Sequence, residues 1–153
     1  MTVRSDEDGF TLIEVTCAVA IVALLAAIML PIMPRTTSHP QLESYALEIA
    51  SLLKADRNAA IRLRSDIATR IDVQSRTLRS GARGEIVRVP DDVSVAFVSA
   101  TTCRRQRSES AIVFLASGMS CGGAIVLTRF GGGFEIRVAW LTGGVEIVPH
   151  HAM

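Results

Sequence analysis

One apolar stretch near the start of the chain constrains its fold more than any other feature. The stretch runs from Phe10 to Met33, and no Asp, Glu, Lys or Arg occurs from Val15 to Pro34. As a helix it would be roughly 36 Å long, enough to cross a bilayer core of about 30 Å. The sequence therefore predicts a transmembrane helix at residues 10–34, followed by a head at residues 35–153.

A cleaved secretory signal peptide is the obvious alternative for such a stretch. That class of peptide has a basic N-terminal region, a shorter apolar core and a small-residue cleavage site after the core. Here the apolar stretch is longer, and Pro31, Met33 and Pro34 follow in place of an Ala-x-Ala pattern. We therefore expect the helix to remain in the mature protein.

A single carboxylate, Glu14, lies near the beginning of the apolar stretch. A carboxylate inside a membrane helix is costly, so such a residue marks a functional site by default. The alternative is that Glu14 lies at the membrane boundary and reaches water. Helix geometry alone leaves both interpretations open.

The residues from Gly9 to Val15 read Gly-Phe-Thr-Leu-Ile-Glu-Val and resemble the type IV prepilin processing motif, shared by pilins and type II secretion pseudopilins. The resemblance implies a leader at residues 1–9, cleavage between Gly9 and Phe10 by a membrane-embedded prepilin peptidase, and N-methylation of Phe10. It also implies that Glu14 pairs with the N-terminal amine of a neighbouring subunit during assembly. The leader departs from the family's usual positive charge, because it carries one basic and three acidic residues.

The head begins with a predicted amphipathic helix at about residues 41–64. Ser38 and Gln41 form a capping-box pattern in front of it, and Pro40 is tolerated in a first helical turn. Apolar side chains then recur at helical spacing, and charged residues occupy the opposite face. The apolar positions are Leu42, Tyr45, Ala46, Ile49, Leu52, Leu53, Ala59, Ala60 and Leu63.

After Ser65 the pattern alternates with a period of two, which predicts strands over about residues 67–148. The clearest pair is a hairpin of Ile125–Phe130 and Phe134–Trp140, joined by a turn at Gly131–Gly133. The predicted fold class is α+β: a long N-terminal transmembrane helix, or pilin spine, and an amphipathic helix packed on a small antiparallel β-sandwich head. The remaining predicted strands are 67–73, 86–89, 93–98, 111–116 and 145–148.

This order of elements is similar to that of the H-type minor pseudopilins of type II secretion. The segments Ser117–Leu127 and Ala139–Val145 are similar to that family's closing strands. The resemblance implies a subunit near the tip of a pseudopilus that assists export of folded proteins across the outer membrane. It implies a single-pass protein of the bacterial inner membrane with a periplasmic head. The implied partners are the major and tip pseudopilins, the prepilin peptidase and the inner-membrane assembly platform.

Three cysteines leave one unpaired if a disulfide forms. Cys17 lies inside the apolar stretch, whereas Cys103 and Cys121 lie in the head. In an extracytoplasmic head these two are natural disulfide partners. Their spacing alone does not establish that they meet.

An enzyme is the first competing interpretation. Gly118–Gly122 matches G-x-S-x-G, with Ser120 as nucleophile and His150 following. That motif requires a strand–turn–helix context, whereas a strand pattern follows here, so a glycine-rich loop explains the match better. No Cys or His set has the spacing of a zinc site, and no phosphate-binding glycine loop occurs. We therefore expect neither an enzyme nor a bound metal or cofactor.

Nucleic-acid binding is the second competing interpretation, as in a minor pilin of a type IV pilus or DNA-uptake machine. One basic and four acidic residues precede Arg35, which leaves 15 and 11 in the head and a net charge of about +4. Arg104, Arg105 and Arg107 form the one basic cluster. Single-strand platforms use exposed aromatics, and the sequence places Phe97, Phe114, Phe134 and Trp140 in strand patterns as core. We therefore expect no nucleic-acid partner.

Overall fold

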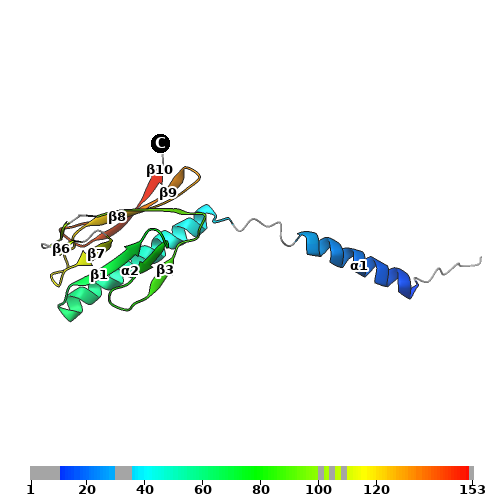
Figure 1. The fold of residues 1–153 in the computed structure, drawn as a ribbon, viewed down its shortest axis with the longest axis horizontal. Coiled ribbons are helices and arrows are strands. Elements are labelled where there is room, and N and C mark those ends of the chain that lie inside the picture. The colour runs from blue at the N-terminus through cyan, green and yellow to red at the C-terminus, as the bar shows by residue number, and fades with distance from the viewer. Residues whose placement is uncertain (1–10, 30–35, 100–101, 104–105, 108–109, 152–153) are drawn as a thin grey trace, which may run out of the picture. The chain divides into compact units, whose positions relative to one another are not determined.

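The computed structural model describes residues 11–29, 36–99, 102–103, 106–107 and 110–151. The chain divides into two compact units between Thr36 and Thr37. The first contains helix α1, Leu12–Met29. The second, which we call the head, contains helix α2, His39–Leu63, and all the strands (Figure 1). This confirms the α+β class predicted from sequence, with an N-terminal helix and antiparallel sheets.

Helix α2 forms where the apolar periodicity predicts it, beginning two residues before and ending one residue before the predicted bounds. Pro40 occupies its first turn, and the Gln41 side chain accepts a hydrogen bond from the Ser38 N–H at 2.8 Å. The helix ends at Leu63, and the capping residue Arg64 adopts the left-handed conformation with φ of 49°. The Ser65 N–H then donates to the Ala60 carbonyl, which satisfies one of the carbonyls left open at a helix end.

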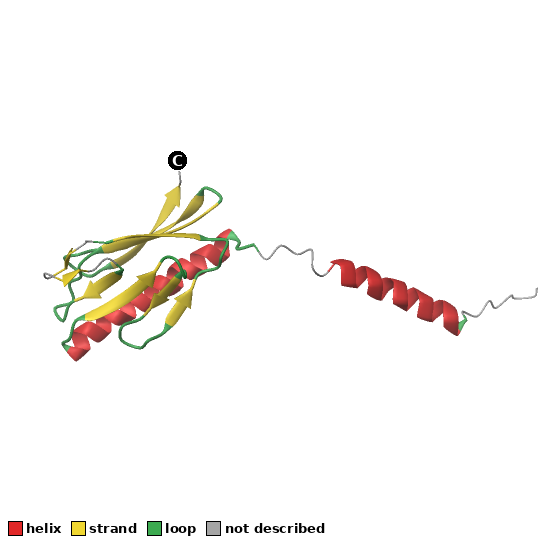
Figure 2. Cartoon of the chain, viewed as in Figure 1, coloured by secondary structure: helices red, strands yellow, loops and turns green. Residues whose placement is uncertain are grey.

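The head contains two four-stranded antiparallel sheets (Figure 2). The first has the order β3-β2-β1-β7 and the second β10-β9-β8-β4, and β5 and β6 form a separate two-stranded ladder. Helix α2 contacts β1 and β7 of the first sheet and β9 and β10 of the second. The strands are β1 Ile67–Asp72, β2 Thr77–Arg79, β3 Ile86–Arg88, β4 Ser94–Val98, β5 Thr102–Cys103, β6 Gln106–Arg107, β7 Ala111–Phe114, β8 Gly123–Arg129, β9 Gly132–Val138 and β10 Val145–His151.

One hydrophobic core lies within the head. The alternation in β1 is strict, with Ile67, Thr69 and Ile71 buried and the residues between them exposed. Helix α2 buries one stripe against the same core. The large apolar side chains that are fully shielded from solvent include Ile49, Leu53, Leu78, Ile112, Phe114, Ile125, Leu127 and Ile136.

The hairpin of β8 and β9 differs from its prediction at both ends. Its turn is Phe130-Gly131 rather than Gly131–Gly133, because a two-residue loop of this handedness needs positive φ at both positions, here 47° and 79°. Strand β9 stops at Val138, so the prediction of Trp140 as a core residue is wrong. The Ala139 and Gly143 backbones already close the next turn, and Trp140 is 65% exposed.

Helix α1 is apolar around its whole circumference. The structure confirms a helix within the predicted 10–34 segment over residues 12–29; Pro31 and Pro34 lie outside the described residues. Neither helix, as far as the described residues define it, is long and apolar enough to cross a membrane.

Candidate assembly site

Of the residues predicted to act in processing and assembly, Glu14 is described, whereas Gly9 and Phe10 lie outside the described residues. Glu14 occupies the first turn of α1. Thr11 precedes the helix, and its carbonyl accepts hydrogen bonds from the N–H groups of Glu14 at 3.0 Å and Val15 at 3.3 Å. The carboxylate therefore lies at the positive end of the helix dipole, where a negative charge is favoured.

The Glu14 side chain is exposed, and no described residue donates a hydrogen bond to it or pairs with it. The apolar side chains around it are exposed too, and they include Leu12 at 84% and Ile13 at 72%. A helix that is apolar on every side normally lies in a membrane or in a helix bundle. The arrangement leaves the carboxylate free to meet a cation supplied by another molecule.

The start of the head is held by one carboxylate, Asp92, in the turn between β3 and β4. It accepts hydrogen bonds from the Thr37 N–H and the Thr37 hydroxyl, both at 2.7 Å. Arg129 contributes an ion pair to the same carboxylate, with Nε 3.1 Å from Oδ2 but without hydrogen-bond alignment. The two Thr37 hydrogen bonds, assisted by Arg129, hold the pKa of Asp92 below its usual value.

A second carboxylate, Asp56 in α2, is completely buried. It accepts hydrogen bonds from the hydroxyls of Thr69 at 2.6 Å and Ser80 at 2.5 Å, and from the N–H groups of Gly81 at 3.0 Å and Ala82 at 3.3 Å. Four donors therefore compensate the cost of burying this group. Sequence reasoning missed Asp56, although it lies four residues after Leu52 and three after Leu53, on the apolar stripe of the helix.

Arg57, the next residue of α2, links the helix to two loops of the head. Its Nε donates to the Gly118 and Thr142 carbonyls, both at 3.1 Å. These two carbonyls belong to the loops before β8 and before β10, which are far apart in the sequence. Helix α2 thus fixes both loops through one guanidinium group.

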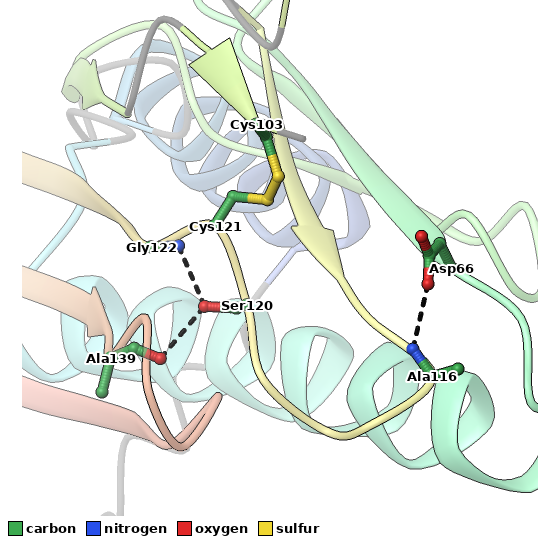
Figure 3. Close-up of a disulfide and its surroundings, with 7 residues drawn as sticks. All are labelled: Asp66, Cys103, Ala116, Ser120, Cys121, Gly122 and Ala139. Atoms are coloured by element: carbon green, nitrogen blue, oxygen red, sulfur yellow. Dashed lines mark hydrogen bonds between the residues drawn. A yellow bond between two sulfur atoms is a disulfide. The ribbon is translucent and has the colours of Figure 1, made fainter. Parts of the chain in front are cut away.

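Cys103 in β5 and Cys121 before β8 form a disulfide, with Cα atoms 5.6 Å apart (Figure 3). The bond joins the β5–β6 ladder to the start of the second sheet. Cys17, in α1, is free and exposed. Arg104 and Arg105 of the basic cluster lie outside the described residues, and nothing is described of the Arg107 side chain.

Ser120, the candidate nucleophile, is buried, and its hydroxyl donates to the Ala139 carbonyl at 3.0 Å (Figure 3). The same oxygen accepts from the Gly122 N–H at 3.0 Å. Strand β8, not a helix, follows two residues after Cys121. The glycine-rich motif therefore forms a structural loop, and the strand–turn–helix context of a nucleophile elbow is absent from these residues.

The N-terminal segment matches a known family. Residues 4–30 match the family model for the prokaryotic N-terminal methylation motif. The chain is also 29% identical over 149 residues to the type II secretion system protein H of Xanthomonas campestris pv. campestris, which covers 96% of this chain and 86% of the relative. The similarity to that relative thus extends through the head.

Solved structures share the fold. The minor pseudopilin EpsH from the type 2 secretion system of Vibrio cholerae superposes with a TM-score of 0.54 at 14% identity, covering 69% of this chain and 94% of EpsH. The type IV minor pilin FimU of Pseudomonas aeruginosa gives 0.52 at 18% identity, covering 74% of this chain and 92% of FimU. Motif, sequence relative and fold together confirm the resemblance to the H-type minor pseudopilins.

Proposed function

We propose that this chain is a minor pseudopilin of a type II secretion system. It would be a structural subunit near the tip of the pseudopilus that assists export of folded proteins across the outer membrane. The observation that carries the proposal is the similarity to a type II secretion protein H along 96% of the chain, with the methylation motif at its N-terminus. Its partners would be the major and tip pseudopilins and the inner-membrane assembly platform.

Processing by the prepilin peptidase would prepare the chain for this role. Cleavage between Gly9 and Phe10 removes the acidic leader and creates a new α-amino group, which the enzyme then methylates. The apolar helix at residues 10–34 holds the mature protein in the inner membrane, with the head in the periplasm. The disulfide between Cys103 and Cys121 suits that oxidising compartment.

Glu14 would then set the register between subunits. A carboxylate in apolar surroundings is strongly penalised unless an opposite charge meets it. Glu14 has no partner among the described residues, so the N-terminal amine of a neighbouring subunit satisfies it in the filament. Pairing between neighbouring chains is possible only at one axial offset, and this offset fixes how each helix joins the bundle.

The chain would act as a structural protein and not as an enzyme. The relatives are named as a type II secretion system protein H, a minor pseudopilin and a minor pilin. The hydroxyl of Ser120 already donates to the Ala139 carbonyl. A minor pilin of a type IV pilus or DNA-uptake machine is the second candidate, because the FimU fold is similar at comparable TM-score. The protein H relative favours secretion over this alternative.

Replacing Glu14 with Leu tests the assembly role. We expect Glu14→Leu to be cleaved normally, because the residues at the scissile bond are unchanged, but to enter filaments poorly and restore secretion weakly in a strain lacking the native gene. Val15→Leu, one position along the same helix, is the matched control and should behave like the native chain. Normal incorporation and secretion by Glu14→Leu would overturn the assigned role of Glu14.

A further inference from the structure

Two arginines face each other across the middle of the first sheet. Arg70 in β1 and Arg79 in β2 are directly opposite in the antiparallel register, and both side chains are exposed. Like charges in this position are destabilising. Neither guanidinium has a hydrogen bond or an ion pair with any described residue. The pair therefore places two guanidinium groups side by side, and no described residue neutralises their positive charges.

Asp72, an acidic residue on the same exposed face of β1 as Arg70, is already engaged. Its Oδ1 accepts hydrogen bonds from the N–H groups of Gln74 at 2.9 Å and Ser75 at 3.1 Å, which close the turn between β1 and β2. Hydrogen bonding from Ser75 lowers the pKa of Asp72, so this carboxyl stays ionised. Asp72 forms no ion pair with Arg70 or Arg79, so the positive charge of these three residues exceeds the negative charge by one.

Both arginines line an open cleft of about 670 Å³. Its other walls include Asp72, Val73 and Phe97, the last contributed by β4 of the second sheet. A volume of this size accommodates several residues of an extended chain. The cleft thus combines two guanidinium groups that can donate hydrogen bonds, an apolar wall and one negative charge, that of Asp72.

We propose that this cleft binds an acidic segment of a partner protein, with carboxylates received by Arg70 and Arg79. A guanidinium binds a carboxylate through two parallel hydrogen bonds, and such a contact also relieves the repulsion between the two arginines. Val73 and Phe97 would contact apolar side chains of the segment. A single-stranded nucleic acid fits less well, because such ligands bind on several exposed aromatics and Phe97 is the one aromatic among the described lining residues.

Fluorescence anisotropy of the full-length protein in detergent micelles tests the proposal. The probes are a fluorescein-labelled peptide of alternating glutamate and alanine, its glutamine counterpart and a labelled oligothymidine. We expect the glutamate peptide to bind best. Arg70→Gln combined with Arg79→Gln should weaken it at least about tenfold, or about 1.4 kcal/mol. Arg83→Gln with Arg88→Gln removes the same charge from exposed positions outside the lining and should change the affinity little.

Three results of the binding assay would overturn the proposal. Equal weakening in both double variants would show attraction to net charge alone, tighter arginine-dependent binding of oligothymidine would identify a phosphate site, and absence of peptide binding would leave the cleft without this role. The melting temperature of the Arg70→Gln, Arg79→Gln variant should stay level or rise, because a repulsion is removed. A fall of several degrees would assign the arginines to the fold and contradict a binding role. The assay uses unassembled protein in detergent micelles, so its outcome does not depend on whether the chain enters a filament.

Discussion

At the scale of single residues, Asp56 shows how the head accommodates a buried charge. Its carboxylate projects from α2 and is shielded from solvent, and its four donors come from β1 and from the segment after β2. Gly81 permits this approach, because a Cβ there would collide with the Ala68 carbonyl. Four hydrogen bonds to this one carboxylate therefore join the helix to the first sheet and to the segment after β2.

Removing this carboxylate should be among the most damaging single changes in the head. Asp56→Ala leaves the buried hydroxyls of Thr69 and Ser80 without their acceptor, and we expect a loss of about 3 kcal/mol in the free energy of unfolding. Urea denaturation followed by circular dichroism measures it. Asp91→Asn is the control, because the Arg76–Asp91 ion pair is on the surface. Equal stability of the two variants would refute the role given to Asp56.

Phe130 combines an unfavourable backbone conformation with an exposed apolar side chain. It is 91% exposed at the hairpin tip and holds a φ of 47°, which bulky side chains rarely adopt. Asn-Gly is the preferred sequence for this type of turn. We expect Phe130→Asn to raise the free energy of unfolding by about 1 kcal/mol, measured by thermal melting. Destabilisation by Phe130→Asn would show that the Arg129 guanidinium, 4.2 Å from the ring centroid, gains more from Phe130 than the turn loses.

At the scale of elements, the disulfide fixes the β5–β6 ladder to the second sheet. Cys103 and Cys121 are 18 residues apart, and closing a loop of that length stabilises a fold by about 3 kcal/mol in the chain-entropy model. Cys103→Ser with Cys121→Ser should therefore lower the denaturation midpoint, and a reductant should lower that of the native head by a similar amount. Cys17→Ser is the control and should leave the midpoint unchanged. Insensitivity to both treatments would show that the bond contributes nothing.

The elements themselves could be predicted where the signal is local. Helical periodicity located α2 to within two residues, and alternation located β1 and β10 at their first residues. The short strands β2, β5 and β6 were not predicted, because two or three residues carry no measurable period. The hairpin turn was placed one residue too late, since three consecutive glycines suggest a longer loop than the backbone needs.

At the scale of the whole molecule, the contacts that sequence could not give are those between distant segments. Thr37 meets Asp92, Arg57 meets both Gly118 and Thr142, and Arg70 faces Arg79 only once the sheets form. The N-terminal motif could be recognised from the sequence because it consists of consecutive residues. The sequence alone therefore predicts a processing site, whereas the cleft is visible only in the structure.

The proposed assembly depends on processing at the start of the chain, and measuring the mass of the mature protein tests whether that processing occurs. We predict that protein purified from membranes of cells with an active prepilin peptidase begins at Phe10 and carries one added methyl group. Cells lacking the peptidase should retain residues 1–9. A mature chain that begins at Met1 in the presence of the peptidase, or that has lost the apolar helix, would contradict the account.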